Sequence, residues 1–504
     1  MATGSPIPGT PVEHRGLVHW MERVLKELDK VRTAPEPDTV HDLRVALRRC
    51  RSLAAVMEEV DQDPSWPEMR RLGRKLFRQL GELRDTQVLE EWANKLGAEG
   101  DPVRERLLTH LGKIEADEKE AALRAAGKFD QKAWKGYEHV LRRRVRIVPP
   151  DRPAAQSLAL ERLLAAKELH LQALRTEKPE PWHALRIGVK RFRYTVESLL
   201  PERYVVWGEP LKHVQDLLGE VHDLDVLMET IAHVAGEESE EVKAGWRERI
   251  AKERSARLEE YRQLCMGTNS LWQGWREGLP QGRYQETAAL ARLRATARAL
   301  GAGTGKFVQV ARLAMKLFDG LTKANAGAPF GNRDMRKVMR AAARLHGIGT
   351  GLRTKPPQKA ARKFLRNLAM PVGWNEAEWD LLGLAARYHR GKEPRAKDKA
   401  FARLGKEEQR SLCVMAGVLR LARELRKYGV VSTKGLQVER SMDAIIVRAP
   451  GLENTEQSAA RVAAGKHLLE TVLDRPLIVQ PLPGLAKVLE LPRAPETIHA
   501  AASD

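Results

Sequence analysis

The chain has 504 residues, of which 42% are hydrophobic, so it is long enough for two or three domains with buried cores. Its three cysteines form no CxxC pair and no run of about 18 apolar residues occurs, which argues against a disulfide framework, a zinc ribbon and a membrane span. The formal net charge of +20 suits nucleic acid, an acidic membrane surface or inorganic polyphosphate as a partner, and equally a basic protein with a solvated arginine-rich surface.

Residues 1–14 are rich in proline and glycine and are expected to form a disordered tail. They show no signal-peptide pattern, so the expected location is the cytoplasm. Helical periodicity then runs from Leu17 to about Leu264, in a chain dominated by helix-forming residues. Proline-containing segments interrupt it and predict the ends of helices: TAPEPD (33–38), DQDPSWP (61–67), VPPDRP (148–153) and EKPEPW (177–182).

The main domain boundary is predicted at the glycine-rich segment 267–282. Helical patterning resumes at Tyr284 and lasts to about Tyr428. GAGTGKF (301–307) departs from the phosphate-binding GxxxxGK[ST] motif and is expected to be an interhelical turn. Residues 436–451 and 475–481 predict short strands on either side of a helix. We therefore expect a mainly α protein with a small terminal β element.

Two segments of the first half recur in the same order, which indicates duplication of a helical unit. HDLRVALRRCR begins at His41, and WHALRIGVKRFRY contains the matching His183, 142 residues later. LGELRDTQVL and LGEVHDLDVL follow, so that Asp85 matches Asp223. The predicted first domain spans 15–280, with repeats over about 15–147 and 153–265.

In each copy the histidine and three basic residues fall on one helical stripe. At about 100° per residue, His41, Arg44, Arg48 and Arg51 lie within an arc of about 80°. The equivalent stripe of the second copy holds His183, Arg186, Lys190 and Arg193. Like charges this close repel one another, so facing stripes would create a groove that an anion should occupy. Arginine suits phosphate, because its planar donor fork is bidentate.

Further basic residues follow each stripe: Arg71, Arg74, Lys75 and Arg78 in the first copy and Lys212 in the second. They are candidate phosphate contacts, with a solvated helix face as the alternative.

The duplicated segments resemble the two halves of a CHAD domain, a histidine-containing α-helical domain, over roughly residues 15–265. The resemblance implies two helical bundles related by pseudo-twofold symmetry around a basic pore. Family members bind inorganic polyphosphate, and some localise to polyphosphate granules. No catalysis is attributed to this fold by itself.

Residues 284–490 resemble the HD-like C-terminal region of the exopolyphosphatase and guanosine-pentaphosphate phosphatase family. The resemblance depends on segments that occur in order: FVQVARLAMKLFDGL (307–321), AAARLHGIGTGL (341–352), LLGLAARYHRGKEP (381–394) and VLRLARELRK (418–427). The actin-like domain that holds this family's hydrolytic residues has no counterpart in residues 1–280, which are predicted to be helical. Residues 491–504 are expected to form a second tail.

A working HD metal site needs a histidine, a His-Asp doublet and a later aspartate, because divalent cations need several converging ligands. The corresponding positions hold Gln309, the pair His346-Gly347 and Arg426, so one of four ligands remains. His389 is either a phosphate contact or a structural residue. We expect no metal, no cofactor and no catalytic residue.

The predicted function is binding of inorganic polyphosphate, with polyphosphate granules as a further place of localisation. Two alternatives stay open. One is a metal-dependent phosphohydrolase that uses the C-terminal domain. The other is a nucleic-acid binder, although the basic helices offer few aromatic residues for base stacking. Nucleic acid is otherwise expected to bind only non-specifically, and no membrane partner is expected.

Overall fold

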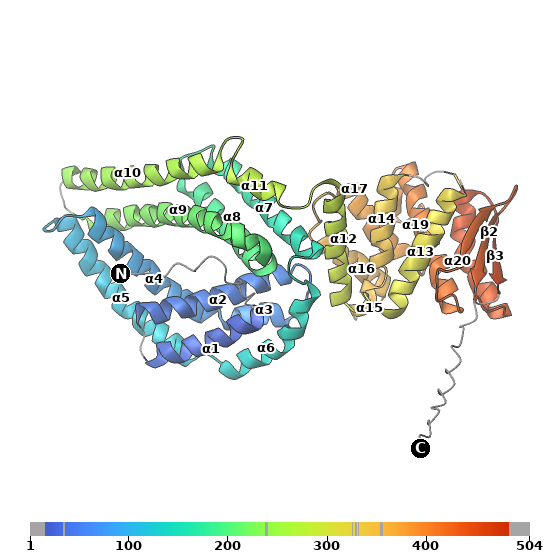
Figure 1. Cartoon of the computed structure of the whole chain (residues 1–504), viewed down its shortest axis with the longest axis horizontal. Coiled ribbons are helices and arrows are strands. Elements are labelled where there is room, and N and C mark those ends of the chain that lie inside the picture. Colours follow the sequence, from blue (N-terminus) through green and yellow to red (C-terminus); the bar gives the residue numbers. More distant parts are fainter. Residues whose placement is uncertain are drawn as a thin grey trace, which may run out of the picture. The chain divides into compact units, whose positions relative to one another are not determined.

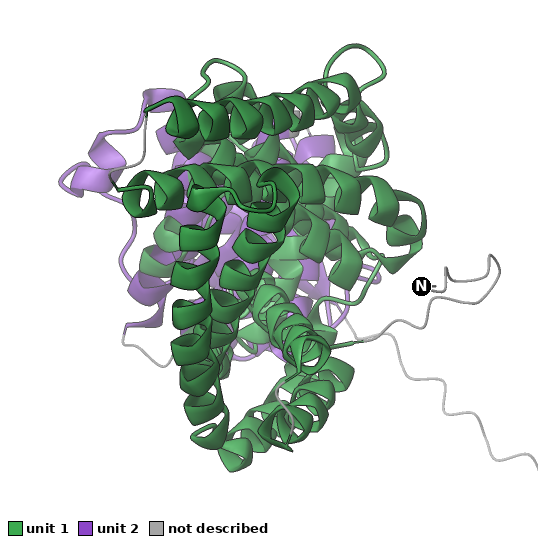
Figure 2. Cartoon of the chain, turned by 90° about the vertical axis from the view of Figure 1, so that its left-hand side faces the viewer, with its two compact units in different colours: residues 1–303, 350–353, 363–379 green, residues 304–349, 354–362, 380–504 purple. Residues whose placement is uncertain are grey.

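The computed structural model describes residues 16–33, 36–236, 240–324, 326–327, 330, 332–352 and 356–482. The tails predicted over 1–14 and 491–504 lie outside these residues. The chain divides into two compact units, shown in different colours in Figure 2. Unit 1 comprises residues 1–303, 350–353 and 363–379, and unit 2 comprises residues 304–349, 354–362 and 380–504.

The fold is mainly α with a small sheet near its end, as the sequence predicts. The first half of unit 1 contains α1 (Leu17–Thr33), α2 (Pro37–Met57), α3 (Ser65–Leu72), α4 (Arg74–Leu96), α5 (Pro102–Gly127), α6 (Gln131–Arg144) and the short 3₁₀ helix Val145–Ile147. The second half contains α7 (Pro153–Ala173), α8 (Pro179–Leu199), α9 (Pro201–Val234), α10 (Glu240–Cys265) and α11 (Leu271–Glu277). Pro37, Pro153 and Pro179, from three of the predicted breaks, open α2, α7 and α8. Proline suits this position because its missing N–H would have no partner inside the helix.

The two halves of unit 1 repeat the same helix arrangement. α1 packs on α2 as α7 packs on α8, and α4 pairs with α5 as α9 pairs with α10 (Figure 1). The copies differ where Gly73 separates α3 from α4, since the second copy has the single helix α9 in their place. The repeated helices α2 and α8, which carry the basic stripes, pack against each other.

Apolar side chains join the two halves at two places. One core cluster combines residues of both copies, among them Leu43 and Leu47 of α2 with Leu185 and Val189 of α8. A second cluster joins the distal ends of α4, α5, α9 and α10, where Trp92 and Trp246 are buried. The duplicated segments are therefore held together on two sides, which fixes the relative position of the four helices α2, α4, α8 and α9.

Helix α12 (Gly282–Ala299) belongs to unit 1, although the sequence places the domain boundary before it. It packs on α7, and its Arg292, which is 1% exposed, forms an ion pair of 2.7 Å with Glu161. A buried arginine is tolerated only with such a partner, so this contact ties α12 to the first unit. The GAGTGKF segment contains the turn between α12 and α13.

Unit 2 is helical apart from one sheet. Its elements, some of which extend into residues of unit 1, are α13 (Gly305–Lys323), α14 (Arg333–Leu345), α15 (Ile348–Gly351), α16 (Pro357–Asn367), α17 (Glu376–Tyr388), α18 (Lys399–Ala402), α19 (Lys406–Lys427), β1 (Gln437–Arg440), β2 (Ile445–Pro450), α20 (Glu456–Leu473) and β3 (Leu477–Leu482). β2 is central, antiparallel to β1 and parallel to β3, and α20 is the crossover between β2 and β3. Within the described part of the chain, no helix combines the length and apolar character needed to cross a bilayer.

Candidate anion-binding site

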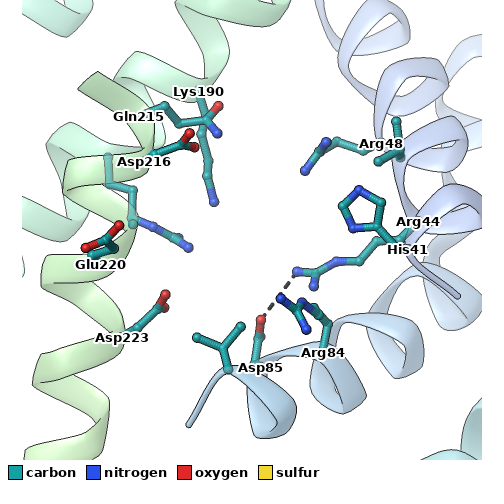
Figure 3. A pocket seen from close by; sticks show the side chains of 14 residues that line it. His41, Arg44, Arg48, Arg84, Asp85, Lys190, Gln215, Asp216, Glu220 and Asp223 are labelled. Carbon is teal, nitrogen blue, oxygen red and sulfur yellow. Dashed lines mark hydrogen bonds and ion pairs between the residues drawn. The ribbon is translucent and has the colours of Figure 1, made fainter. Parts of the chain in front are cut away.

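A cavity of about 280 Å³, here called the shared cavity, lies between α2 and α4 of the first copy and α8 and α9 of the second (Figure 3). Its basic side chains are those of His41, Arg44, Arg48, Arg84, Arg186 and Lys190. In Figure 3, His41, Arg44 and Arg48 point into the cavity from α2, and Lys190 enters from the opposite side. Most residues of the two repeated stripes therefore line the same cavity.

Several of these cationic groups have no anionic partner within ion-pair distance in the described residues. The Nε atoms of Arg44, Arg48 and Arg186 are buried without a hydrogen-bond partner. Arg44 forms only a long contact, 3.4 Å between Nη2 and Asp85 Oδ1, while Arg48 lies over the Tyr194 ring at 5.2 Å. Arg48 and Arg186 have no carboxylate within ion-pair distance in the described residues, so an anion in the cavity would pair with charges that the protein leaves uncompensated.

The shared cavity also contains carboxylates, which the stripes do not predict. Asp85 comes from α4, and Asp216, Glu220 and Asp223 come from α9, together with the amide of Gln215. They lower the net charge of the cavity, because four acids stand beside five arginine and lysine side chains. The available signal was the repeated Gly-Glu-x-x-Asp motif, which places Asp85 and Asp223 at equivalent positions of the two copies.

Burial moves two opposite charges of the shared cavity toward neutrality. Burial, followed by the charges of Arg186, Arg48 and Arg44, lowers the pKa of Lys190 to about 7. Burial likewise raises the pKa of Asp223 to about 6, opposed by the charge of Arg186. Both groups consequently titrate near neutral pH, where the charge of the cavity depends on the proton concentration.

The two repeated histidines have different surroundings. His41 lines the shared cavity, and burial followed by Arg48 lowers its pKa. His183 lies outside the lining and contacts His222 of α9, with 3.3 Å between the Nδ1 atoms and 4.5 Å between the ring centroids. Burial followed by Arg186 lowers the pKa of His222 to about 4, so this ring is neutral near pH 7. His183 therefore belongs to a histidine pair beside the cavity, and its role in binding stays a prediction.

The last basic residues of the two stripes leave the shared cavity. Arg51 lies over the Phe77 ring at 4.9 Å and donates from Nη1 to the Arg70 carbonyl at 2.6 Å. Arg193 is 8% exposed and contacts the Tyr204 hydroxyl at 3.4 Å. Arg49, which the helical projection places off the stripe, pairs with Glu197 of α8 and lies over the Trp20 ring.

The further basic candidates are exposed and do not line the shared cavity: Arg71, Arg74, Lys75, Arg78 and Lys212. Arg78 is 3.6 Å from Glu82 and Lys212 is 3.9 Å from Asp216, each one helical turn away. Exposed pairs of this kind contribute little to stability, so these residues match the solvated-face alternative in position. Their assignment to the site stays a prediction.

In unit 2, the residues at the positions expected for HD metal ligands make hydrogen bonds within the protein. The Arg426 Nε donates a hydrogen bond to the Gln309 Oε1, which joins two of these positions directly. His346 and His389 are each 5% exposed, and their Nδ1 atoms bond to the Ala343 and Ala386 carbonyls of their own helices at 2.8 and 2.7 Å. Within the described residues, no group of three or more His, Cys, Asp or Glu side chains is placed to hold a metal ion.

The first unit is thus a helical domain with a duplicated unit, in which both copies place basic residues around one cavity. The family model of the CHAD domain matches residues 19–232, and that of Ppx/GppA phosphatase, domain III, matches residues 304–442. The chain thus contains a CHAD domain followed by a Ppx/GppA phosphatase domain III, as the sequence resemblance predicts. The CHAD family is associated with polyphosphate binding. No curated protein matches the chain.

Proposed function

We propose that this protein binds inorganic polyphosphate in the shared cavity of its CHAD domain and that it does so without catalysis. The observation that carries the proposal is the meeting of Arg44, Arg48, Arg186 and Lys190, two from each copy, around one cavity, where all but Arg44 have no carboxylate within ion-pair distance in the described residues. Phosphate oxygens accept hydrogen bonds from arginine in a bidentate geometry, and a polymer of phosphates presents them on all sides.

The aromatic side chains near the basic helices support polyphosphate over nucleic acid. Phe192 is fully buried and Tyr194 is 6% exposed, and guanidinium groups lie over the rings of Tyr194 and Phe77. Stacking with bases needs open ring faces, and stacking supplies much of the affinity of single-strand binders. Polyphosphate has no bases, so the lack of open ring faces does not lower its affinity for such a site.

Competition between polymers tests the proposal directly. We expect unlabelled long-chain polyphosphate to displace a fluorescent single-stranded DNA or RNA from the full-length protein, followed by fluorescence anisotropy. Equal concentrations of nucleic acid, counted per phosphate, should displace labelled polyphosphate poorly. Efficient displacement by nucleic acid would support the nucleic-acid binder instead, and no binding of polyphosphate would refute the proposal.

Binding should be coupled to proton uptake. A bound polyanion raises the pKa of Lys190 from about 7, so at pH 8 the complex takes up a proton that the free protein lacks. The Kd should therefore rise as pH rises above 7, by up to about tenfold per pH unit. Titration calorimetry at pH 8 in buffers of different ionisation enthalpy measures the uptake.

The matched control for this prediction is Lys190→Arg, which keeps the positive charge at all these pH values. The Lys190→Arg variant should take up fewer protons on binding than the wild type does. The remaining proton uptake comes from the terminal phosphates of the polymer and from other groups such as Asp223. Equal uptake by the wild type and by Lys190→Arg would show that Lys190 is charged in the free protein.

For the second domain we propose an accessory role, in which it adds contact surface or mediates assembly, for example at polyphosphate granules in the cytoplasm. The hydrogen bond from Arg426 to Gln309 supports this, because a guanidinium occupies a position where a phosphohydrolase would carry a metal ligand. Release of phosphate from polyphosphate in the presence of Mg²⁺ or Mn²⁺, abolished by His346→Ala, would support the phosphohydrolase alternative instead.

A further inference from the structure

A second cavity, of about 590 Å³, follows the shared cavity along α2 and α8. The shared cavity is lined by α2 residues from His41 to Arg48, and the second cavity by α2 residues from Arg48 to Val56 and by Glu59, which follows α2. Arg48 and Lys190 line both, so the two cavities meet at this pair of residues. At a rise of about 1.5 Å per residue, the combined path along α2 from His41 to Val56 is about 23 Å long.

The second cavity is more cationic than the shared cavity. Its basic lining comes from both copies and adds four arginines to the shared pair: Arg48, Arg51, Arg70, Arg162, Lys190 and Arg191. Glu59 is the one carboxylate in the lining, against four in the shared cavity. Two of these basic residues, Arg162 and Arg191, were not among the candidates from the sequence.

Internal ion pairs compensate only part of this charge. Arg70 pairs with Glu58 at 2.7 Å, and Arg162 pairs with Glu59. Arg51, Arg191 and the two shared residues have no carboxylate within ion-pair distance among the described residues. Burial followed by the charges of Arg70 and Arg74 lowers the pKa of Arg51, which reports the repulsion in this group. An anion placed here would relieve it.

Aromatic rings hold two of the open guanidinium groups in place. Arg51 lies over Phe77 at 4.9 Å and Arg48 lies over Tyr194 at 5.2 Å, and both rings belong to the lining. A ring on one face of a guanidinium uses none of its N–H groups and limits its rotation, which lowers the entropic cost of binding a phosphate. In Arg51, Nη1 also donates to the Arg70 carbonyl, which fixes the group further. The second cavity is thus a prepared site for an anion with several phosphoryl groups.

From these observations we infer that the second cavity is a separate phosphate-binding chamber. It takes short phosphate oligomers by itself and receives the continuation of a long polyphosphate chain that passes between Arg48 and Lys190 from the shared cavity. This inference rests on the proposed function for long chains. It assigns the binding of short phosphate oligomers to the residues of the second cavity.

The test compares tripolyphosphate, which is shorter than the combined path, with long-chain polyphosphate, by titration calorimetry of the full-length protein. Arg51→Gln with Arg191→Gln removes two open charges of the second cavity, and Arg44→Gln with Arg186→Gln removes two of the shared cavity. Lys132→Gln with Lys135→Gln on α6, both exposed and outside the two linings, is the matched control for net charge. Thermal unfolding checks that each variant is folded.

We expect the Arg51/Arg191 variant to weaken tripolyphosphate at least tenfold, the Arg44/Arg186 variant to weaken it less than threefold, and both to weaken the long chain. Should Arg51→Gln impair folding, the exposed single variant Arg191→Glu gives the same comparison. Tripolyphosphate binding that depends on Arg44 and Arg186 but not on Arg51 and Arg191 would overturn the second chamber and leave the proposed function intact. Failure of the wild type to bind the long chain would instead refute the proposed function.

Discussion

Replacing Arg44, Arg48, Arg186 and Lys190 together by glutamine is expected to weaken the binding of long-chain polyphosphate about 1000-fold. Hydrogen bonds to charged groups contribute roughly 1.5–3 kcal/mol each, so the net loss of only two of the four, about 4 kcal/mol, already corresponds to this factor. The loss is large because the carboxylates of Asp85, Asp216, Glu220 and Asp223 stay behind and then repel the polymer. Equilibrium binding of a fluorescent polyphosphate measures the change.

The matched control replaces four basic residues of α6, outside both cavities: Lys132, Lys135, Arg142 and Arg143. It removes the same net charge, so it isolates the contribution of position from that of overall attraction. We expect it to lower affinity less than tenfold. A folded cavity variant that binds as tightly as this control would show that polyphosphate is held elsewhere on the protein.

The affinity for polyphosphate should fall steeply with salt. If the five arginine and lysine side chains of the shared cavity each displace about 0.7 counterion from the polymer, the affinity falls about 100-fold between 50 and 200 mM salt. The slope of log K against log salt concentration, measured for the wild type and for the cavity variant at constant pH, tests this count. The variant should have a shallower slope, because fewer counterions are released.

A flat salt dependence would be incompatible with a site made of open guanidinium groups. A steep slope that is the same in the wild type and the cavity variant would place the released counterions on another basic surface. The two measurements therefore separate the strength of the electrostatic attraction from its location.

Much of the fold was predictable from local patterns. Prolines 37, 153 and 179 stand at helix starts, the helical periodicity that begins at Leu17 matches the start of α1, and the strands near 436–451 and 475–481 are present. These features depend on a few neighbouring residues, since proline restricts its own backbone and periodicity reports which face of a helix is buried. The boundary of unit 1 was less predictable, because the Arg292–Glu161 contact that ties α12 to α7 joins residues 131 positions apart.

The candidate site was predictable where the duplication repeats it. The repeat assigns His41, Arg44, Arg48, Arg186 and Lys190 to one stripe pattern, and the structure brings these five into the lining of one cavity. Two other stripe residues do not line this cavity: His183 contacts His222, and Arg193 contacts Tyr204. Equivalent positions in a duplicated sequence acquire different neighbours because the copies differ around them, as α3 and α4 differ from the single helix α9.

The sequence by itself determined the helices, the duplication and the two cationic stripes, because each follows from residues that are close along the chain. Only the tertiary structure decided which carboxylates face the stripes, that burial brings Lys190 and Asp223 to titrate near neutral pH, and that Arg70, Arg162 and Arg191 converge on a second cavity. The physical reason is that charge interaction and desolvation depend on distances between side chains of different helices. Those distances are set by how α2, α4, α8 and α9 pack, which no single segment encodes.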